Sequence, residues 1–111
     1  MARLSGAEVG EGTRRRDIRV DPFDREFDMG LARPLSRSVR LNGFATCLRL
    51  EQVYWDILAR IARDNCCSVS ALLSHVDREV HLRHGGVKNF SGLVRVMCVV
   101  HSLNESAAGA G

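Results

Sequence analysis

The stretch FATCLRLEQVYWDILARIARDNCCSVSALL, from Phe44 to Leu73, decides the fold of this 111-residue chain. Residues 44–50 alternate between apolar and more polar side chains, which is the period of an extended strand. The residues that follow have the spacing of an amphipathic helix, then a short break and the start of a second helix. A single strand is not stable alone, so this pattern predicts a small α-rich domain whose strand needs a partner.

The strand is expected to have one face toward a core and one toward solvent, because successive side chains point to opposite sides. The inward face carries Thr46, Leu48 and Leu50. The outward face carries Ala45, Cys47 and Arg49.

The segment RSVRLNG before the strand leaves two interpretations open. Asn42-Gly43 between two alternating runs is the strongest short signal for a two-residue hairpin, in which RSVRL would fold back on the strand. Alternatively, the chain stays extended with a kink at Gly43, and the partner strand comes from a second copy. Even in the hairpin, one outer strand edge remains unpaired, and unpaired edges recruit partners, so the sequence predicts a dimer.

The first helix is expected to begin at Glu51, whose negative charge suits the first turn of a helix. It should end near Asn65, because Asn tolerates the left-handed conformation that terminates many helices. The expected buried stripe consists of Tyr54, Ile57, Leu58 and Ile61, widened by Trp55.

Ser68 is expected to cap a second helix that runs to about Arg83, before two glycines. The apolar stripe of this helix contains Val69, Leu72, Leu73, Val76 and Val80. The third segment, NFSGLVRVMCVVHSL, is interpreted as a helix capped at Asn89 or Ser91. Its β-branched part, VRVMCVV, would alternatively suit a buried strand.

The charge of the chain, +3 in total, is unevenly distributed. Seven arginines balance seven acids up to Pro34, whereas nine basic residues outnumber six acids after it. Fifteen of the sixteen basic residues are arginine, whose forked guanidinium suits phosphates and guanine edges. A GC-rich genome would also produce this preference.

The ends of the chain lack helical or strand periodicity. Residues 1–35 are expected to form a flexible arm, in which Val20 to Phe27 would be the part that docks, and residues 105–111 a disordered tail. The domain itself is placed at residues 36–104. No apolar run approaches the roughly 18 to 20 residues that cross a bilayer, and the start is unlike a signal peptide, so a cytoplasmic protein without a membrane partner is expected.

Candidate catalytic and metal-binding residues are sparse, and no enzyme activity, cofactor or metal is predicted. His81 and His84 are spaced for one helix face, but without a cysteine or carboxylate frame they are interpreted as a solvated helix end. The adjacent Cys66 and Cys67 are interpreted as turn cysteines rather than a redox switch.

The order strand, helix, turn, helix resembles the ribbon-helix-helix fold of the Arc, MetJ and CopG superfamily. The resemblance is carried by LRL and its following acid, by WDILARIARDN and by SVSALL. From Arg37 to Cys98 the chain is similar to a bacterial subfamily of uncharacterised ribbon-helix-helix domain proteins. The expected fold is therefore mainly α with a short β-ribbon, forming an intertwined homodimer, with an additional C-terminal helix.

The resemblance implies a transcriptional regulator that binds double-stranded DNA, with strands from two subunits forming a ribbon in the major groove. The base contacts it implies are Ala45, Cys47 and Arg49. Phosphate contacts are expected from Cys67, Ser68 and Val69 at the second helix start, and from Arg40. Two or more dimers are expected side by side on DNA.

The resemblance also implies a core shared by two subunits. Its expected members are Thr46, Leu48, Leu50, Trp55, Leu58, Ile61, Leu72, Leu73 and Val76. Relatives commonly carry Gly at the position of Cys66, so Asn65 is expected to take the left-handed conformation instead.

The alternative function is a protein-interaction or antitoxin-type module with the same dimer fold and little DNA binding. There the third helix would dock a protein partner through Phe90, Leu93, Val96, Met97 and Val100.

Overall fold

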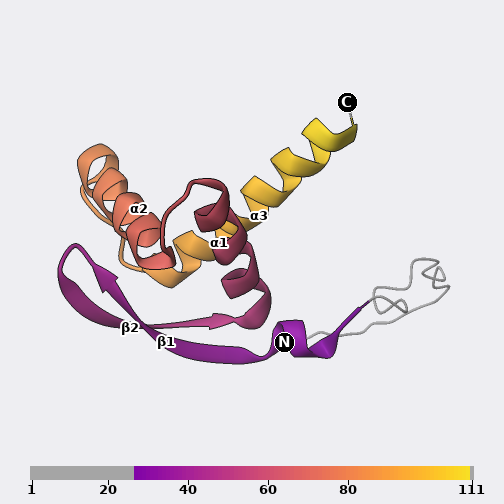
Figure 1. Ribbon diagram of the computed structural model, residues 1–111. Helices are drawn as coiled ribbons and strands as arrows, with labels where there is room; N and C mark the ends of the chain where they lie inside the picture. Colours follow the sequence, from indigo (N-terminus) through magenta and orange to yellow (C-terminus); the bar gives the residue numbers. More distant parts are fainter. Residues whose placement is uncertain (1–26, 111) are drawn as a thin grey trace, which may run out of the picture.

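The structure is a computed structural model that describes residues 27–110. A 3₁₀ helix, η1 (Met29–Ala32), precedes two strands, and three helices follow them. The strands are β1 (Pro34–Leu41) and β2 (Phe44–Glu51), and the helices are α1 (Gln52–Asp64), α2 (Val69–His84) and α3 (Phe90–Ala110). All three helices lie on one side of the strands (Figure 1). No helix among these residues is long and apolar enough to cross a membrane.

The two strands form a hairpin, which decides between the two interpretations of the RSVRLNG segment. β1 pairs antiparallel with β2, from Pro34 opposite Glu51 to Leu41 opposite Phe44. At the turn, Asn42 and Gly43 have φ values of 51° and 94°. Positive φ at both central residues is the signature of a type I′ turn, whose twist matches that of the flanking strands. β2 therefore finds one partner strand in its own chain.

Hydrogen bonds hold the tip of the hairpin on α2. The Arg40 N–H donates to Ser70 Oγ at 3.1 Å, and the Ser74 hydroxyl donates to the Arg40 carbonyl at 2.9 Å. Ser74 Oγ also accepts from the Asn42 N–H at 3.0 Å, and the Asn42 side chain donates to Asp77 at 3.0 Å. These contacts cover the outer edge of β1 near the turn.

The core lies between the hairpin and the helices. Most of the predicted core is buried inside this single chain: Leu48, Leu50, Trp55, Leu58, Ile61 and Leu73. Thr46, Leu72 and Val76 are only half-buried. The core also contains residues outside the predicted set, Val39 of β1 and the fully covered Val94 and Cys98 of α3. The third helix is thus part of the domain core rather than an appendage.

α1 ends with its left-handed residue one position later than predicted. Asn65 has φ −103°, whereas Cys66 has φ 54°. The Cys67 N–H donates to the Ala62 carbonyl at 2.9 Å and the Cys66 N–H to the Arg63 carbonyl at 3.1 Å, which are the two bonds of a Schellman motif. A left-handed conformation costs a non-glycine residue roughly 1 to 2 kcal/mol, and the two carbonyls satisfied at the helix end offset it.

The predicted starts of α2 and α3 are confirmed. Ser68 Oγ accepts a hydrogen bond from the Ala71 N–H at 3.0 Å, and Asn89 Oδ1 accepts one from the Gly92 N–H at 2.9 Å. Each bond satisfies an amide that has no partner within its helix. The third segment is helical throughout, which excludes the buried-strand interpretation.

The regular structure extends beyond the predicted domain limits at both ends. β1 begins at Pro34, which lies opposite Glu51 in the sheet. α3 continues to Ala110, so most of the predicted disordered tail is helical. Alanine has the highest helix propensity, and an ion pair of 3.2 Å between Arg60 and Glu105 ties this part of α3 to α1.

Most of the predicted N-terminal arm lies outside the described residues. This includes the segment from Val20 to Phe27, of which only Phe27 is described.

Candidate nucleic-acid interface

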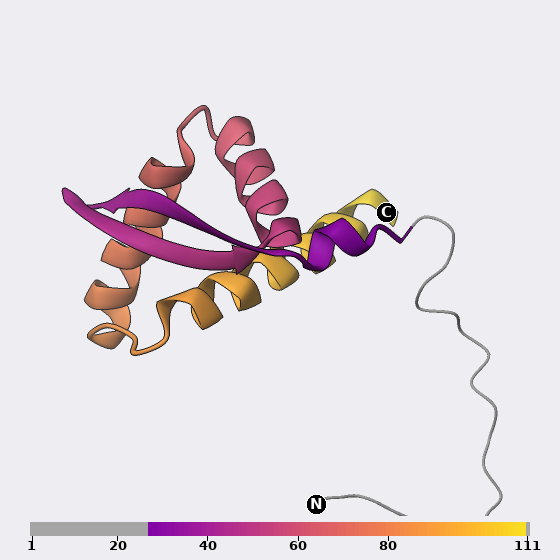
Figure 2. The ribbon, with the colours of Figure 1, turned by 90° about the horizontal axis from the view of Figure 1, so that it is seen from below.

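The face of the hairpin turned away from the helices forms an uncovered side of the described chain (Figure 2). Strand alternation and the pairing register put on it Ser36, Ser38 and Arg40 from β1, and Ala45, Cys47 and Arg49 from β2. All of these side chains are exposed, and we call them the outer face. The three residues predicted to contact bases thus share one solvent-facing surface. Ser36 and Ser38 were not among the predicted site residues, although the alternation in LSRSVRL is a signal for them.

The outer face carries positive charge from one arginine on each strand. Arg40 donates to the Gly43 carbonyl across the turn at 3.0 Å. The Arg49 guanidinium makes no hydrogen bond and no ion pair within residues 27–110. Guanidinium groups in this setting are suited to phosphate oxygens and to the O6 and N7 atoms of guanine.

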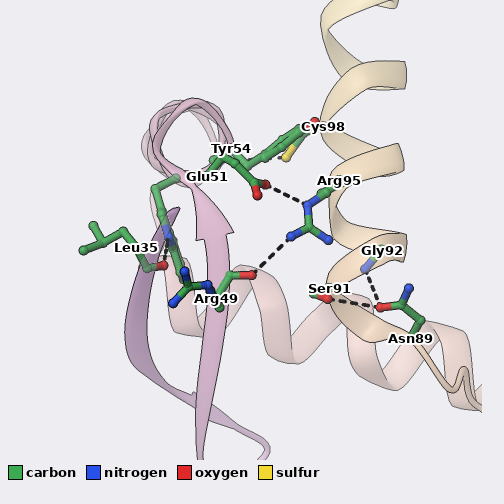
Figure 3. A network of polar contacts seen from close by, with 10 residues as sticks. Leu35, Arg49, Glu51, Tyr54, Asn89, Ser91, Gly92, Arg95 and Cys98 are labelled. Carbon is green, nitrogen blue, oxygen red and sulfur yellow. Dashed lines mark hydrogen bonds and ion pairs between the residues drawn. The ribbon is translucent and has the colours of Figure 1, made fainter. Parts of the chain in front are cut away.

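The carboxylate closest to Arg49 in sequence is Glu51, and it is already paired (Figure 3). Glu51 Oε1 accepts a hydrogen bond from Arg95 Nε of α3 at 2.8 Å. A second nitrogen of Arg95 lies 3.5 Å from the Arg49 carbonyl, and the guanidinium lies 5.9 Å from the centre of the Tyr54 ring. The hydrogen bond from Arg95 lowers the pKa of Glu51, so this carboxylate is ionised at neutral pH.

Glu51 therefore does not serve α1 in the predicted way. It is the N-cap residue, and its side chain makes no hydrogen bond to the helix start. Its carboxylate pairs instead with Arg95, which lies 44 positions away in the sequence. Periodicity and capping patterns carry no signal for such a distant pair.

The start of α2 presents fewer free amides than predicted. No described residue accepts a hydrogen bond from the N–H groups of Ser68 and Val69. The Cys67 N–H, in contrast, donates to the Ala62 carbonyl at 2.9 Å, so Cys67 is not available for a phosphate through its backbone. The hydrogen bond from Arg40 to Ser70 brings this helix start next to β1 and the outer face.

The predicted solvated histidines lie at an exposed end of α2. His81 Nδ1 lies 2.8 Å from the Asp77 carbonyl oxygen and 3.5 Å from its carboxylate. Across residues 27–110, no group of three or more His, Cys, Asp or Glu side chains has an arrangement that would hold a metal ion. The cysteines divide into the exposed Cys47, Cys66 and Cys67 and the buried Cys98.

α3 carries a second exposed surface, which is apolar. Its inner side packs on the core through Val94 and Cys98. Its outer side shows Val96, Val99, Val100 and Leu103, which are 46 to 64% exposed. The C-terminal part of α3 projects away from the other helices (Figure 1). Of the predicted partner-docking residues, Val96 and Val100 are exposed, whereas Phe90, Leu93 and Met97 are half-buried.

Comparisons with known proteins identify a family and a solved structure that this chain resembles. The sequence matches the family described as ribbon-helix-helix domain over residues 34–102, from β1 into α3. The structure is similar to that of an uncharacterized protein from Bordetella pertussis Tohama I, with a TM-score of 0.71 and 29% sequence identity. The alignment covers 78% of this chain and 69% of that one. No curated protein matches the sequence.

Proposed function

The chain belongs to the ribbon-helix-helix domain family, and we propose that it is a DNA-binding homodimer that regulates transcription. The observation that carries this proposal is the outer face, which is exposed, basic through Arg40 and Arg49, and uncovered by the helices. A major groove about 12 Å wide admits a two-stranded ribbon. The proposed ribbon consists of β2 and the β2 strand of a second copy. These are the two central strands of a four-stranded sheet, because β1 of each copy stays paired outside them.

The dimer is proposed to form along the outer edge of β2, because β1 already occupies the inner edge. A hairpin with a two-residue turn directs the amides and carbonyls of Ala45, Cys47 and Arg49 toward that outer edge. Antiparallel pairing centred on Cys47 would put Phe44 of each copy next to Leu50 of the other. This arrangement would cover Phe44, which is 76% exposed in the single chain.

Each part of the interface has a proposed role. Arg49 would donate a forked pair of hydrogen bonds to guanine, worth about 1 to 3 kcal/mol of discrimination. Ala45 and Cys47 supply only a methyl group and a weak donor, so specificity would depend mainly on Arg49. The free amides of Ser68 and Val69, together with Arg40, would contact phosphates.

A salt titration tests DNA binding. The protein is titrated with a random-sequence duplex between about 50 and 200 mM salt, and the logarithm of the binding constant should fall by about 0.9 for each phosphate neutralised per unit of log salt. No binding at the lowest salt would contradict the proposal.

Oxidative cross-linking tests the dimer independently of DNA. Two Cys47 residues opposite each other in an antiparallel hydrogen-bonded pair have Cα atoms about 5.5 Å apart, within the range of a disulfide. In a Cys66→Ser/Cys67→Ser background, mild oxidation should produce a covalent dimer, and Cys47→Ser should abolish it. A monomer with no cross-link at micromolar concentration would contradict pairing along β2.

The second candidate function is a protein-interaction module, including the antitoxin type. The observation that favours it is the apolar outer side of α3, formed by Val96, Val99, Val100 and Leu103. Exposed contiguous apolar surface is typical of docking sites. This candidate predicts no salt-dependent binding to duplex DNA, so the same titration separates the two functions.

A further inference from the structure

The Glu51 carboxylate is a potential partner of Arg49 within the chain, and it would compete with nucleic acid for the Arg49 guanidinium. Arg49 and Glu51 are two residues apart on β2, and side chains at this spacing lie on the same face of a strand. A free carboxylate at Glu51 would be within reach of the Arg49 guanidinium. It would also bring a negative charge close to the proposed phosphate contacts.

In the structure the Glu51 carboxylate is held by Arg95, and Arg49 acts on it only as a nearby positive charge. Arg95 reaches from α3 to Glu51 with a hydrogen bond of 2.8 Å, while its second nitrogen lies 3.5 Å from the Arg49 carbonyl (Figure 3). The Tyr54 ring, 5.9 Å away, also attracts the guanidinium. Arg95 and Glu51 are only about one-third exposed, so this pair is more enclosed than the ion pair of Arg60 with Glu105.

We propose that Arg95 is a positioning residue of the DNA interface, which holds the Glu51 carboxylate and thereby keeps the Arg49 guanidinium free for nucleic acid. This proposal rests on the DNA-binding function proposed above. It assigns α3 a part in DNA recognition, although Arg95 itself does not belong to the outer face. Its action is indirect, because it removes a competitor rather than adding a contact.

The expected size of the effect follows from the competing ion pair. An exposed carboxylate–guanidinium pair between Glu51 and Arg49 would have to be broken for each DNA contact, which lowers affinity by about two- to five-fold per subunit. The freed negative charge would add repulsion from phosphates at low salt, and salt would screen that repulsion. The loss should therefore be larger at low ionic strength.

The first experiment measures duplex binding by four full-length variants against the wild type. Arg95→Gln should weaken binding by the two- to five-fold per subunit given above. Glu51→Gln should bind at least as well as wild type, and the double variant Arg95→Gln/Glu51→Gln should recover the affinity of Glu51→Gln. The control Arg60→Gln removes an equal charge and another ion pair of α3, and should change affinity less than Arg95→Gln.

Recovery of affinity in the double variant distinguishes a positioning role of Arg95 from its other possible roles. If Arg95 touched DNA itself, or if its loss only loosened α3, removing the Glu51 charge would not restore affinity. Failure of the rescue, or wild-type affinity for Arg95→Gln, would overturn the proposal. If the wild type itself does not bind DNA, the proposed function fails first and this inference fails with it.

A second measurement does not need DNA. The Nε–H signal of Arg49 in a nuclear magnetic resonance spectrum should exchange rapidly with water in the wild type, because no side chain of residues 27–110 forms an ion pair with the guanidinium. In Arg95→Gln the exchange should slow as Arg49 pairs with Glu51, and Glu51→Gln in the same chain should reverse it. An Arg49 signal that is identical in the wild type and Arg95→Gln would show that Arg95 does not control this pairing.

Discussion

The two outer edges of the hairpin differ in what covers them. Along β1, both backbone groups of Arg40 bond to α2 through the hydroxyls of Ser70 and Ser74. Along β2, the backbone groups of Ala45 and Cys47 that point outward have no partner within residues 27–110. In the described part of the chain, the only side chain that approaches the β2 edge with a hydrogen bond is Arg95, at the Arg49 carbonyl and at the weak distance of 3.5 Å.

This difference indicates which edge of the hairpin would pair with a strand of a second copy. Exposed strand edges with unpaired backbone groups readily accept another strand, and proteins that remain monomeric usually protect them. Within residues 27–110, α2 protects β1 near the turn, whereas no segment covers β2 at Ala45 and Cys47. The residues proposed to contact bases lie on that open strand.

The largest effect is expected from proline at the open edge. Cys47 lies opposite Ser38, and the amides of both point outward, so proline at either position removes no bond between β1 and β2. Cys47→Pro should abolish dimerisation, because it removes an amide at the centre of the proposed interface. Ser38→Pro should leave the dimer intact, and light scattering at low micromolar concentration compares the two. Equal dissociation by both variants would contradict the assignment of the open edge.

The two arginines of the outer face, one on each strand, are expected to differ in what they contact on DNA. Arg49→Ala should reduce preference for a selected DNA site by about 1 to 3 kcal/mol, because it removes a base contact. Arg40→Ala should weaken binding to all sequences alike and make the salt dependence shallower, as expected for a phosphate contact. Competition assays at fixed salt with selected and random duplexes measure both. Arg49→Ala without any change in preference would remove β2 as the base-contacting strand.

A smaller effect, on stability, is expected at the edge of β1 that α2 covers. Ser74→Ala removes the two hydrogen bonds that the hydroxyl makes to Arg40 and Asn42. Each is worth about 1 kcal/mol, so the free energy of unfolding in urea should fall by roughly 2 kcal/mol. Ser36→Ala is the control, since Ser36 is exposed and makes no hydrogen bond through its side chain to the described chain. Equal stability of both variants would mean that α2 does not hold β1.

The smallest effect concerns pH and the side chain at the end of β2. The hydrogen bond from Arg95 lowers the pKa of Glu51 below its ordinary value of 4.5. A group with a lowered folded-state pKa contributes stability above its unfolded-state value and loses it as the pH falls through the folded value. The difference in unfolding free energy between the wild type and Glu51→Gln should therefore be constant near neutral pH and shrink below about pH 4.5. A difference that does not depend on pH would contradict this pairing.

Local patterns determined the elements of this protein. Alternation around Asn42-Gly43 indicated a hairpin as one of two interpretations, because a two-residue turn requires positive φ at two adjacent residues and Asn and Gly tolerate it. Helical periodicity with caps at Ser68 and Asn89 located α2 and α3, since a cap and its amide are only three residues apart. The alternation also separated the outward from the inward side of β2 before any packing was known.

The tertiary structure decided everything that depends on residues far apart in sequence. Cys66, rather than Asn65, became left-handed because that conformation closes both terminal hydrogen bonds of α1 while leading the chain into α2. Val94 and Cys98 entered the core only because α3 folds back on the hairpin and α1. Glu51 pairs with Arg95 across 44 residues, a contact created by the docking of α3 against β2. Propensity, periodicity and capping act over a few residues, so they define strands and helices, whereas the partners of each surface are set by how those elements pack.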